Sequence, residues 1–67
     1  MRIRLERRWV DRLLALPESG MGYQRVDVKL ADGRELKDAM VFNAEELDVP
    51  DDFGHAEILD ISLHAAQ

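Results

Sequence analysis

The fold is decided by residues 23–42, YQRVDVKLADGRELKDAMVF, in which polar and apolar side chains alternate on both sides of a turn. One face of the first half carries Gln24, Val26, Val28 and Leu30. This period of two is typical of a β-strand with one buried face. The central ADGR contains an Asp-Gly pair, which favours a tight hairpin turn. We therefore predict an antiparallel hairpin made of strands 23–30 and 34–42.

Two registers of this hairpin are compatible with the sequence. A two-residue turn at 32–33 would pair Val26 with Ala39. A three-residue loop at 31–33 would place a different set on the face of Val26, namely Leu36, Asp38, Met40 and Phe42. We predict the three-residue loop because it buries more apolar surface, and a slip of one residue would reverse every side chain. Asp38 would then point inward unless the strand bends or bulges there.

The segment before the hairpin, residues 3–16, carries a broad apolar stripe at helical spacing. Its members are Leu5, Trp9, Val10, Leu13, Leu14 and Leu16. Pro17 ends the helix because the residue before a proline disfavours helical backbone angles. Residues 1–5 also alternate as a strand does. We predict a helix over about 6–16 and leave 1–5 open between helix and strand.

Two segments after the hairpin complete the sheet. EELDVP predicts a strand at 46–49, and AEILDISLH predicts a last strand at 56–64. One face of the last strand carries Leu59, Ile61 and Leu63. DDFGH predicts a loop that places Phe53 against the sheet. We expect one α+β domain over 1–67, with the N-terminal helix packed on a small antiparallel sheet, or on an SH3- or Sm-like barrel, of three to five strands.

Composition and charge exclude several classes of protein. The 67 residues include no cysteine, which removes disulfides, thiolate metal sites and a cysteine nucleophile. The net charge of −5 disfavours a general nucleic-acid or anionic-membrane binder. No stretch approaches the roughly 20 apolar residues of a membrane span, and no secretory signal follows the N-terminal arginines. We expect a cytoplasmic bacterial protein.

The charges are segregated along the chain. Residues 1–12 contain five arginines, whereas residues 38–67 contain eight carboxylates and no lysine or arginine. This asymmetry permits head-to-tail contact between chains, a helix lying near the acidic segments of its own chain, or a basic partner at the acidic half. Exposed ion pairs are worth only about 0–1 kcal/mol each, so we expect the pattern to affect partner choice more than stability.

Residues that could carry chemistry do not form a recognisable motif. The side chains that could hold a divalent ion are Asp48, Asp51, Asp52, His55 and Glu57, without the spacing of a calcium loop or a zinc helix. Ser19, Ser62, His55 and His64 are the only serines and histidines, and no nucleophile elbow is present. The two glycines in 20–22 follow a helix and precede a strand, the reverse of the dinucleotide-binding order. We therefore predict no catalytic residue, no metal and no cofactor.

The stretch LPESGMGYQRVDVKLADGR resembles an uncharacterised family of small bacterial proteins that share a PESGMGYQ-like loop, a VDV strand and a DGR turn. This likeness covers about residues 13–42 and implies no particular activity. A weaker resemblance, in shape, is to Sm-like and SH3-like barrels, in which a helix precedes a V-x-V-x-L-x-x-G-R pattern. The matching residues are Val26, Val28, Leu30, Gly33 and Arg34. The family's later RNA-contacting motif is not evident here, so the likeness implies a shape only.

The function that we expect is a non-enzymatic binding or assembly module that contacts a protein partner or a second copy of itself. We predict that the partner contacts Arg4, Arg8, Trp9 and Arg12. Trp9 has a second interpretation, as a core residue packed with Leu5, Leu13 and Phe42. The alternative function is a small barrel that binds RNA or another polyanion through the arginine-rich N-terminal segment, with the steep salt dependence of phosphate contacts.

Overall fold

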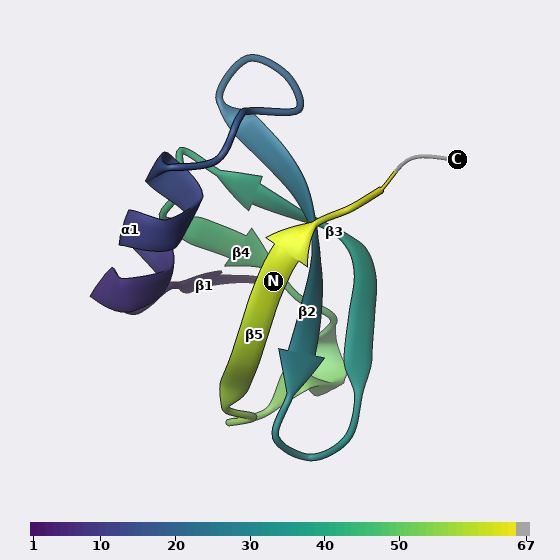
Figure 1. The fold of residues 1–67 in the computed structure, drawn as a ribbon. Coiled ribbons are helices and arrows are strands. Elements are labelled where there is room, and N and C mark those ends of the chain that lie inside the picture. Colours follow the sequence, from purple (N-terminus) through teal and green to yellow (C-terminus); the bar gives the residue numbers. More distant parts are fainter. Residues whose placement is uncertain (66–67) are drawn as a thin grey trace.

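One helix lies against a five-stranded antiparallel sheet in the computed structural model, which describes residues 1–65 (Figure 1). The elements are β1 (Arg2–Arg4), α1 (Arg7–Leu14), β2 (Tyr23–Leu30), β3 (Glu35–Phe42), β4 (Glu46–Asp48), the 3₁₀ helix η1 (Asp51–Phe53) and β5 (Ile58–Leu63). The strand order is β1-β4-β3-β2-β5. The predicted α+β class is confirmed, and each predicted strand lies within two residues of the observed one. The open question at the N-terminus is resolved as strand β1, which pairs with β4.

Helix α1 is shorter than the predicted 6–16. After Leu14 the chain tightens into i→i+3 hydrogen bonds, from Ala15 N to Arg12 O and from Leu16 N to Leu13 O. Such tightening is common where a helix ends, and Pro17 follows it directly. Leu14 is 69% exposed, so the prediction that it joins the apolar stripe is wrong.

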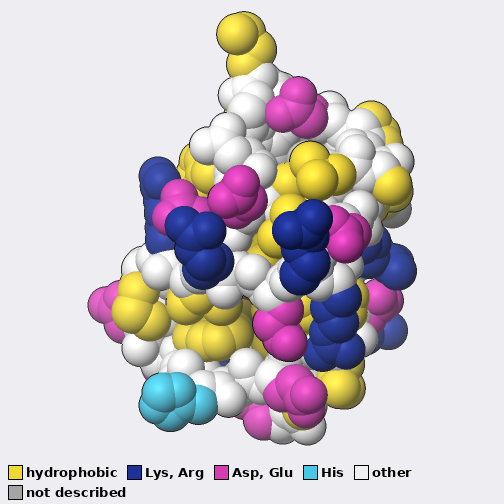
Figure 2. Space-filling model, turned by 90° about the vertical axis from the view of Figure 1, so that its left-hand side faces the viewer, with side chains coloured by type: hydrophobic (Ala, Val, Ile, Leu, Met, Phe, Trp, Pro, Cys, Tyr) yellow, Lys and Arg dark blue, Asp and Glu magenta, His cyan; other side chains and the backbone are white. Residues whose placement is uncertain are grey.

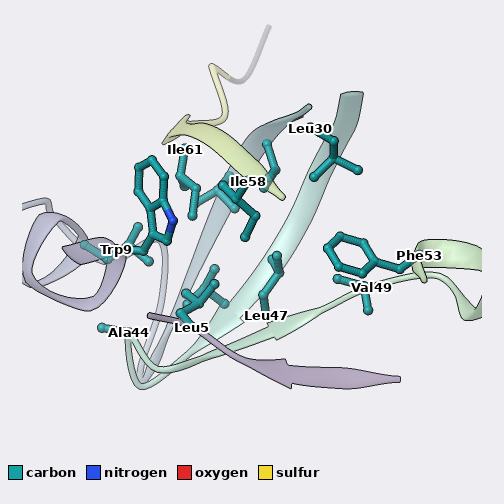
Figure 3. Packing of buried hydrophobic residues seen from close by; sticks show 13 residues of the cluster. Leu5, Trp9, Leu30, Ala44, Leu47, Val49, Phe53, Ile58 and Ile61 are labelled. Atoms are coloured by element: carbon teal, nitrogen blue, oxygen red, sulfur yellow. The ribbon is translucent and has the colours of Figure 1, made fainter. Parts of the chain in front are cut away.

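The core lies between the helix and the concave side of the sheet. Its buried apolar residues are Leu5, Trp9, Leu13, Val26, Val28, Leu30, Val41, Ala44, Leu47, Val49, Phe53, Ile58 and Ile61. Trp9 reaches from α1 toward Ile58 and Ile61 of β5 (Figure 3). The indole is 7% exposed, and Val26 and Val28 are fully buried. The predicted packing of the helix on the hairpin is therefore confirmed.

The β2–β3 hairpin has the predicted three-residue loop. Leu30 N donates to Arg34 O (3.0 Å), and Gly33 takes the left-handed conformation with φ +94°. Glycine is favoured there because it has no Cβ to clash at positive φ. Arg34 then joins the hairpin to η1, since its guanidinium donates to Asp52 O (3.0 Å) and Phe53 O (2.9 Å). These bonds hold Phe53 in the core, as predicted for the DDFGH segment.

A bulge at Asp38 reverses the side-chain parity in the second half of β3. The register shifts between Val26 and Val28, and Asp38 has φ +58°. Beyond the bulge Val41 faces the core, so the prediction that Met40 and Phe42 do so is wrong. One extra residue in a strand moves every later side chain to the other face. The bulge turns Asp38 away from the core, as predicted for a bend or bulge at this position.

A second bulge changes the face of Leu59. Ile58 pairs with Leu30 and Asp60 pairs with Lys29, which leaves Leu59 between them and 58% exposed. The prediction that Leu59 shares the buried face of Ile61 is therefore wrong, because the bulge shifts the pairing by one residue. Ile61 itself is fully buried, as predicted.

Candidate functional site

The predicted partner-binding residues lie on the side of the molecule that carries α1. Arg4 is at the end of β1 with a side chain 76% exposed. The Arg8 guanidinium lies 4.7 Å from the centre of the Trp9 ring and covers the edge of the core. Arg12 donates through Nε to Ile61 O of β5 (2.8 Å). Three of the four residues therefore reach solvent, and Trp9 belongs to the core.

The arginines of the N-terminal segment pair with carboxylates of the same chain. The pairs are Arg2–Glu46, Arg4–Glu45, Arg7–Asp11, Arg8–Glu6 and Arg12–Asp60, at 3.1 to 3.7 Å. Figure 2 shows the result, with dark blue and magenta side chains interspersed over this side. Of the three arrangements that the charge asymmetry permits, the structure shows the basic segment beside acidic β4. Each of these five arginines therefore has a carboxylate beside it.

A groove of about 540 Å³ opens at the C-terminal end of α1. Its walls come from three segments: the end of the helix, the 17–22 loop with the start of β2, and the turn after β3. The lining residues are Leu13, Leu14, Leu16, Glu18, Tyr23, Gln24, Asn43 and Ala44. Asn43 N donates to Gly22 O (2.9 Å) and so joins the loop to the turn. We take this groove as the candidate functional site.

The backbone around the groove depends on special conformations. Asn43 and Ala44 are consecutive residues with φ +55° and +60°, and Glu45 N closes the turn on Phe42 O (3.1 Å). On the loop side, a Cβ at Gly20 would lie 2.3 Å from the Tyr23 ring. The Tyr23 ring therefore occupies space that only a glycine leaves free. The SGMGY sequence thus shapes one wall of the groove.

Gln24 forms the base of the groove and caps the helix. Its side chain is 3% exposed, and Nε2 donates to the carbonyl oxygens of Leu13 (2.9 Å), Leu16 (3.3 Å) and Pro17 (3.3 Å). Leu13 O also accepts from Leu16 N, whereas the carbonyls of Leu16 and Pro17 lie beyond the end of the helix and have this amide as their donor. The inward position of Gln24 is the predicted one. Its role as a helix cap was not predicted. The sequence did carry a signal for that role, because Gln24 is the one polar side chain on a strand face that is otherwise apolar.

A large apolar side chain is exposed in the groove, and a second one is exposed on the 17–22 loop. Leu14 lines the groove from α1, and Met21, 99% exposed, lies at the tip of the loop that forms the opposite wall. The sequence prediction treated 17–22 only as a connection between helix and strand. The groove was missed because it depends on the 43–44 turn, which lies 20 residues further along the chain.

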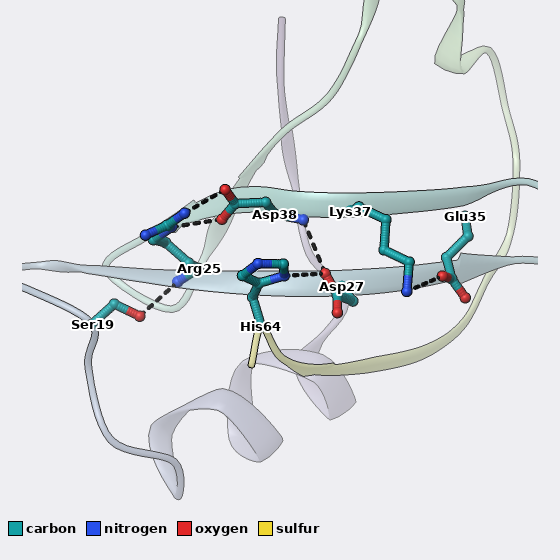
Figure 4. A network of polar contacts seen from close by, with 7 residues as sticks. All are labelled: Ser19, Arg25, Asp27, Glu35, Lys37, Asp38 and His64. Atoms are coloured by element: carbon teal, nitrogen blue, oxygen red, sulfur yellow. Dashed lines mark hydrogen bonds and ion pairs between the residues drawn. The ribbon is translucent and has the colours of Figure 1, made fainter. Parts of the chain in front are cut away.

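A polar network lies on the outer face of the sheet (Figure 4). Arg25 pairs with both carboxylate oxygens of Asp38. Asp27 Oδ1 accepts the backbone N–H of Asp38 (2.9 Å) and contacts His64 Nδ1 (2.8 Å). Ser19 Oγ accepts the backbone N–H of Arg25 (2.9 Å). The serine and the histidine thus contact different groups, and the network fixes the bulge of β3.

This network lowers the pKa of two carboxyl groups. The Asp38 backbone N–H, and then His64, hold the pKa of Asp27 below its ordinary value. The hydrogen-bonded Arg25 does the same for the pKa of Asp38. Each group therefore stabilises the fold above its unfolded pKa of about 3.9, and this stabilisation is lost as the pH falls through the lower folded value.

We expect Asp38→Asn to reduce the loss of stability in acid. Asparagine removes the charge but tolerates the positive φ at this position, so the bulge is retained. Urea unfolding at several pH values between about 2 and 6 measures the effect. Asp51→Asn, which removes an exposed carboxylate elsewhere, is the control. A wild-type pH dependence in Asp38→Asn would contradict the assigned role of the Arg25 pair.

Because comparisons with known proteins give no relative, the function is inferred from the candidate site. No family model, no curated protein and no solved structure matches this chain. Within residues 1–65, no three His, Asp or Glu side chains converge in a way that could hold a metal ion. In the same range, no helix is long and apolar enough to cross a membrane.

Proposed function

We propose that this chain is a cytoplasmic, non-enzymatic bacterial module that binds a protein partner at the groove beside the C-terminal end of α1. The observation that carries the proposal is the apolar lining of an open groove by Leu14, Leu16 and Tyr23, of which Leu14 is 69% exposed. Large apolar side chains gathered at a concave site gain free energy when a partner removes them from water. A homodimer is one form that this contact can take.

The ion pairs of the arginines on α1 support a protein partner over a polyanion. Arg8 and Arg12 are each paired with a carboxylate of the same chain, so RNA would have to displace those carboxylates. A protein surface of mixed charge can instead exchange ion pairs with this side of the molecule. Arg4 and the Arg8 guanidinium above Trp9 then form a polar rim outside the apolar contact.

The proposal is tested by capture of a partner protein on three immobilised versions of this chain. The wild type is compared with Leu14→Ser/Met21→Ser and with Leu59→Ser, whose side chain is also exposed but belongs to β5. We expect a protein bound equally by the wild type and the Leu59 variant, and about tenfold less by the double variant, because two apolar anchors are lost.

Two further measurements complete this test. Light scattering shows whether the partner is a second copy of the chain, and circular dichroism shows that all three proteins are folded. Equal capture by the double variant would contradict the proposed site. Salt-sensitive RNA binding by the wild type would favour the polyanion alternative.

A further inference from the structure

The polar groups at the groove select for a positively charged ligand. Among the described residues that line it there is no lysine, arginine or histidine, and the one charged side chain is the carboxylate of Glu18. Glu18 Oε2 accepts the backbone N–H of Gly22 (3.1 Å), and within residues 1–65 no cation lies within ion-pair distance of it. This contrasts with the arginines of the helix side, which are all paired.

A hydrogen-bond acceptor is free at the base of the groove. All three bonds of Gln24 use Nε2, and no group in the described chain donates to Oε1. Among the described residues, Trp9 Nε1 is the one fully buried polar side-chain atom without a partner. Gln24 Oε1 also lacks a partner, so it is not fully buried and remains accessible at the groove. The C-terminal end of α1 adds the negative end of the helix dipole. The base of the groove is therefore suited to an N–H donor.

The walls suit an aliphatic chain. Leu14, Leu16 and Tyr23 present apolar surface above Glu18 and Gln24. A lysine or arginine side chain matches this arrangement of apolar walls and polar acceptors, because it has an apolar stem and a charged head with several N–H donors.

We infer that the groove binds a lysine or arginine side chain of the protein partner, with the stem against Leu14 and Tyr23 and the head donating to Gln24 Oε1 and the Glu18 carboxylate. The inference rests on the proposed function and names the chemistry of the partner at that site. The net charge of −5 favours the approach of a basic segment.

Titration of the ¹⁵N-labelled protein with two short peptides tests the inference. Acetyl-Gly-Leu-Lys-Leu-Gly-amide is compared with the same peptide carrying norleucine, which keeps the stem and lacks the ammonium group. We expect the lysine peptide to bind about fivefold more tightly and to shift the amide signals of residues 43–44 and of residues 14–24 other than Pro17, which has no N–H. Glu18→Gln should abolish that preference. Glu57→Gln, which removes a carboxylate outside the groove, should retain it.

Three results would overturn the inference: equal binding of the two peptides, shifts outside the groove, or an equal loss of preference in both glutamine variants. The capture experiment separates this failure from failure of the proposed function. If the Leu14/Met21 double variant loses a captured protein and lysine has no advantage, the function stands and the inference fails. If lysine binds the groove and no protein is captured, the proposed function fails and the chemistry of the groove stands.

Discussion

Replacing Trp9 with alanine is expected to lower the free energy of unfolding by about 3 kcal/mol. Loss of a buried aromatic side chain costs about 3–5 kcal/mol. The lower end applies here because Trp9 Nε1 is buried without an acceptor, a penalty of about 1–3 kcal/mol that alanine removes. Domains of this length hold about 3–5 kcal/mol in total, so the variant should retain about 0–2 kcal/mol and be partly unfolded at 25 °C.

Urea unfolding followed by far-ultraviolet circular dichroism measures this effect, since the variant lacks the only tryptophan and its fluorescence. Leu14→Ala is the matched control on the same helix, and its exposed side chain should change stability by about 0.5 kcal/mol or less. Trp9→Phe should fall between them, because it keeps an aromatic ring and loses the unpaired N–H. A loss below about 1 kcal/mol in Trp9→Ala would contradict the packing of α1 on β5.

Gln24→Leu is expected to destabilise the domain by about 2 kcal/mol, although leucine is apolar and of similar size. The substitution removes the donor of the Leu16 and Pro17 carbonyl oxygens and leaves Leu13 O with its bond from Leu16 N only. A buried polar group that loses its partner costs about 1–3 kcal/mol. Only part of this cost applies to each oxygen, because Pro17 is exposed and water can reach that end of the helix.

Chemical denaturation measures the loss, and Gln24→Glu provides a second readout. A carboxylate facing three carbonyl oxygens would have a raised pKa, so this variant should regain stability relative to the wild type as the pH falls toward about 4.3, and the gain should be complete below that value. Wild-type stability in Gln24→Leu would show that the amide does not cap the helix. The same variant should lose the preference for the lysine peptide, because it lacks Oε1.

The sequence was informative wherever burial followed a regular period. The alternation in 23–30 predicted the buried faces of β2 correctly, including Gln24, and the helical stripe predicted Trp9 and Leu13. The Asp-Gly pair predicted the turn, the comparison of apolar burial favoured the three-residue loop, and Gly33 is left-handed in that loop. These features could be predicted because neighbouring residues share one backbone geometry, so the pattern of burial appears directly in the sequence.

The candidate site was only partly predictable. Arg4, Arg8 and Arg12 were placed correctly at the surface. Arg8 pairs locally with Glu6, whereas the pairs Arg4–Glu45 and Arg12–Asp60 depend on how β1 and α1 lie against later parts of the chain. The groove needs the loop before β2 and the turn after β3 to meet through the bond between Asn43 and Gly22. No local pattern encodes that meeting.

The sequence by itself therefore determined the kinds of element, their order and most of the core. The tertiary structure alone decided which face Met40, Phe42 and Leu59 occupy and where the groove opens. The physical reason is that a bulge reverses side-chain parity with a single residue. Asp38 adopts its bulge because Asp27 on the neighbouring strand accepts its N–H. These two residues are 11 positions apart and meet only when β2 and β3 have paired.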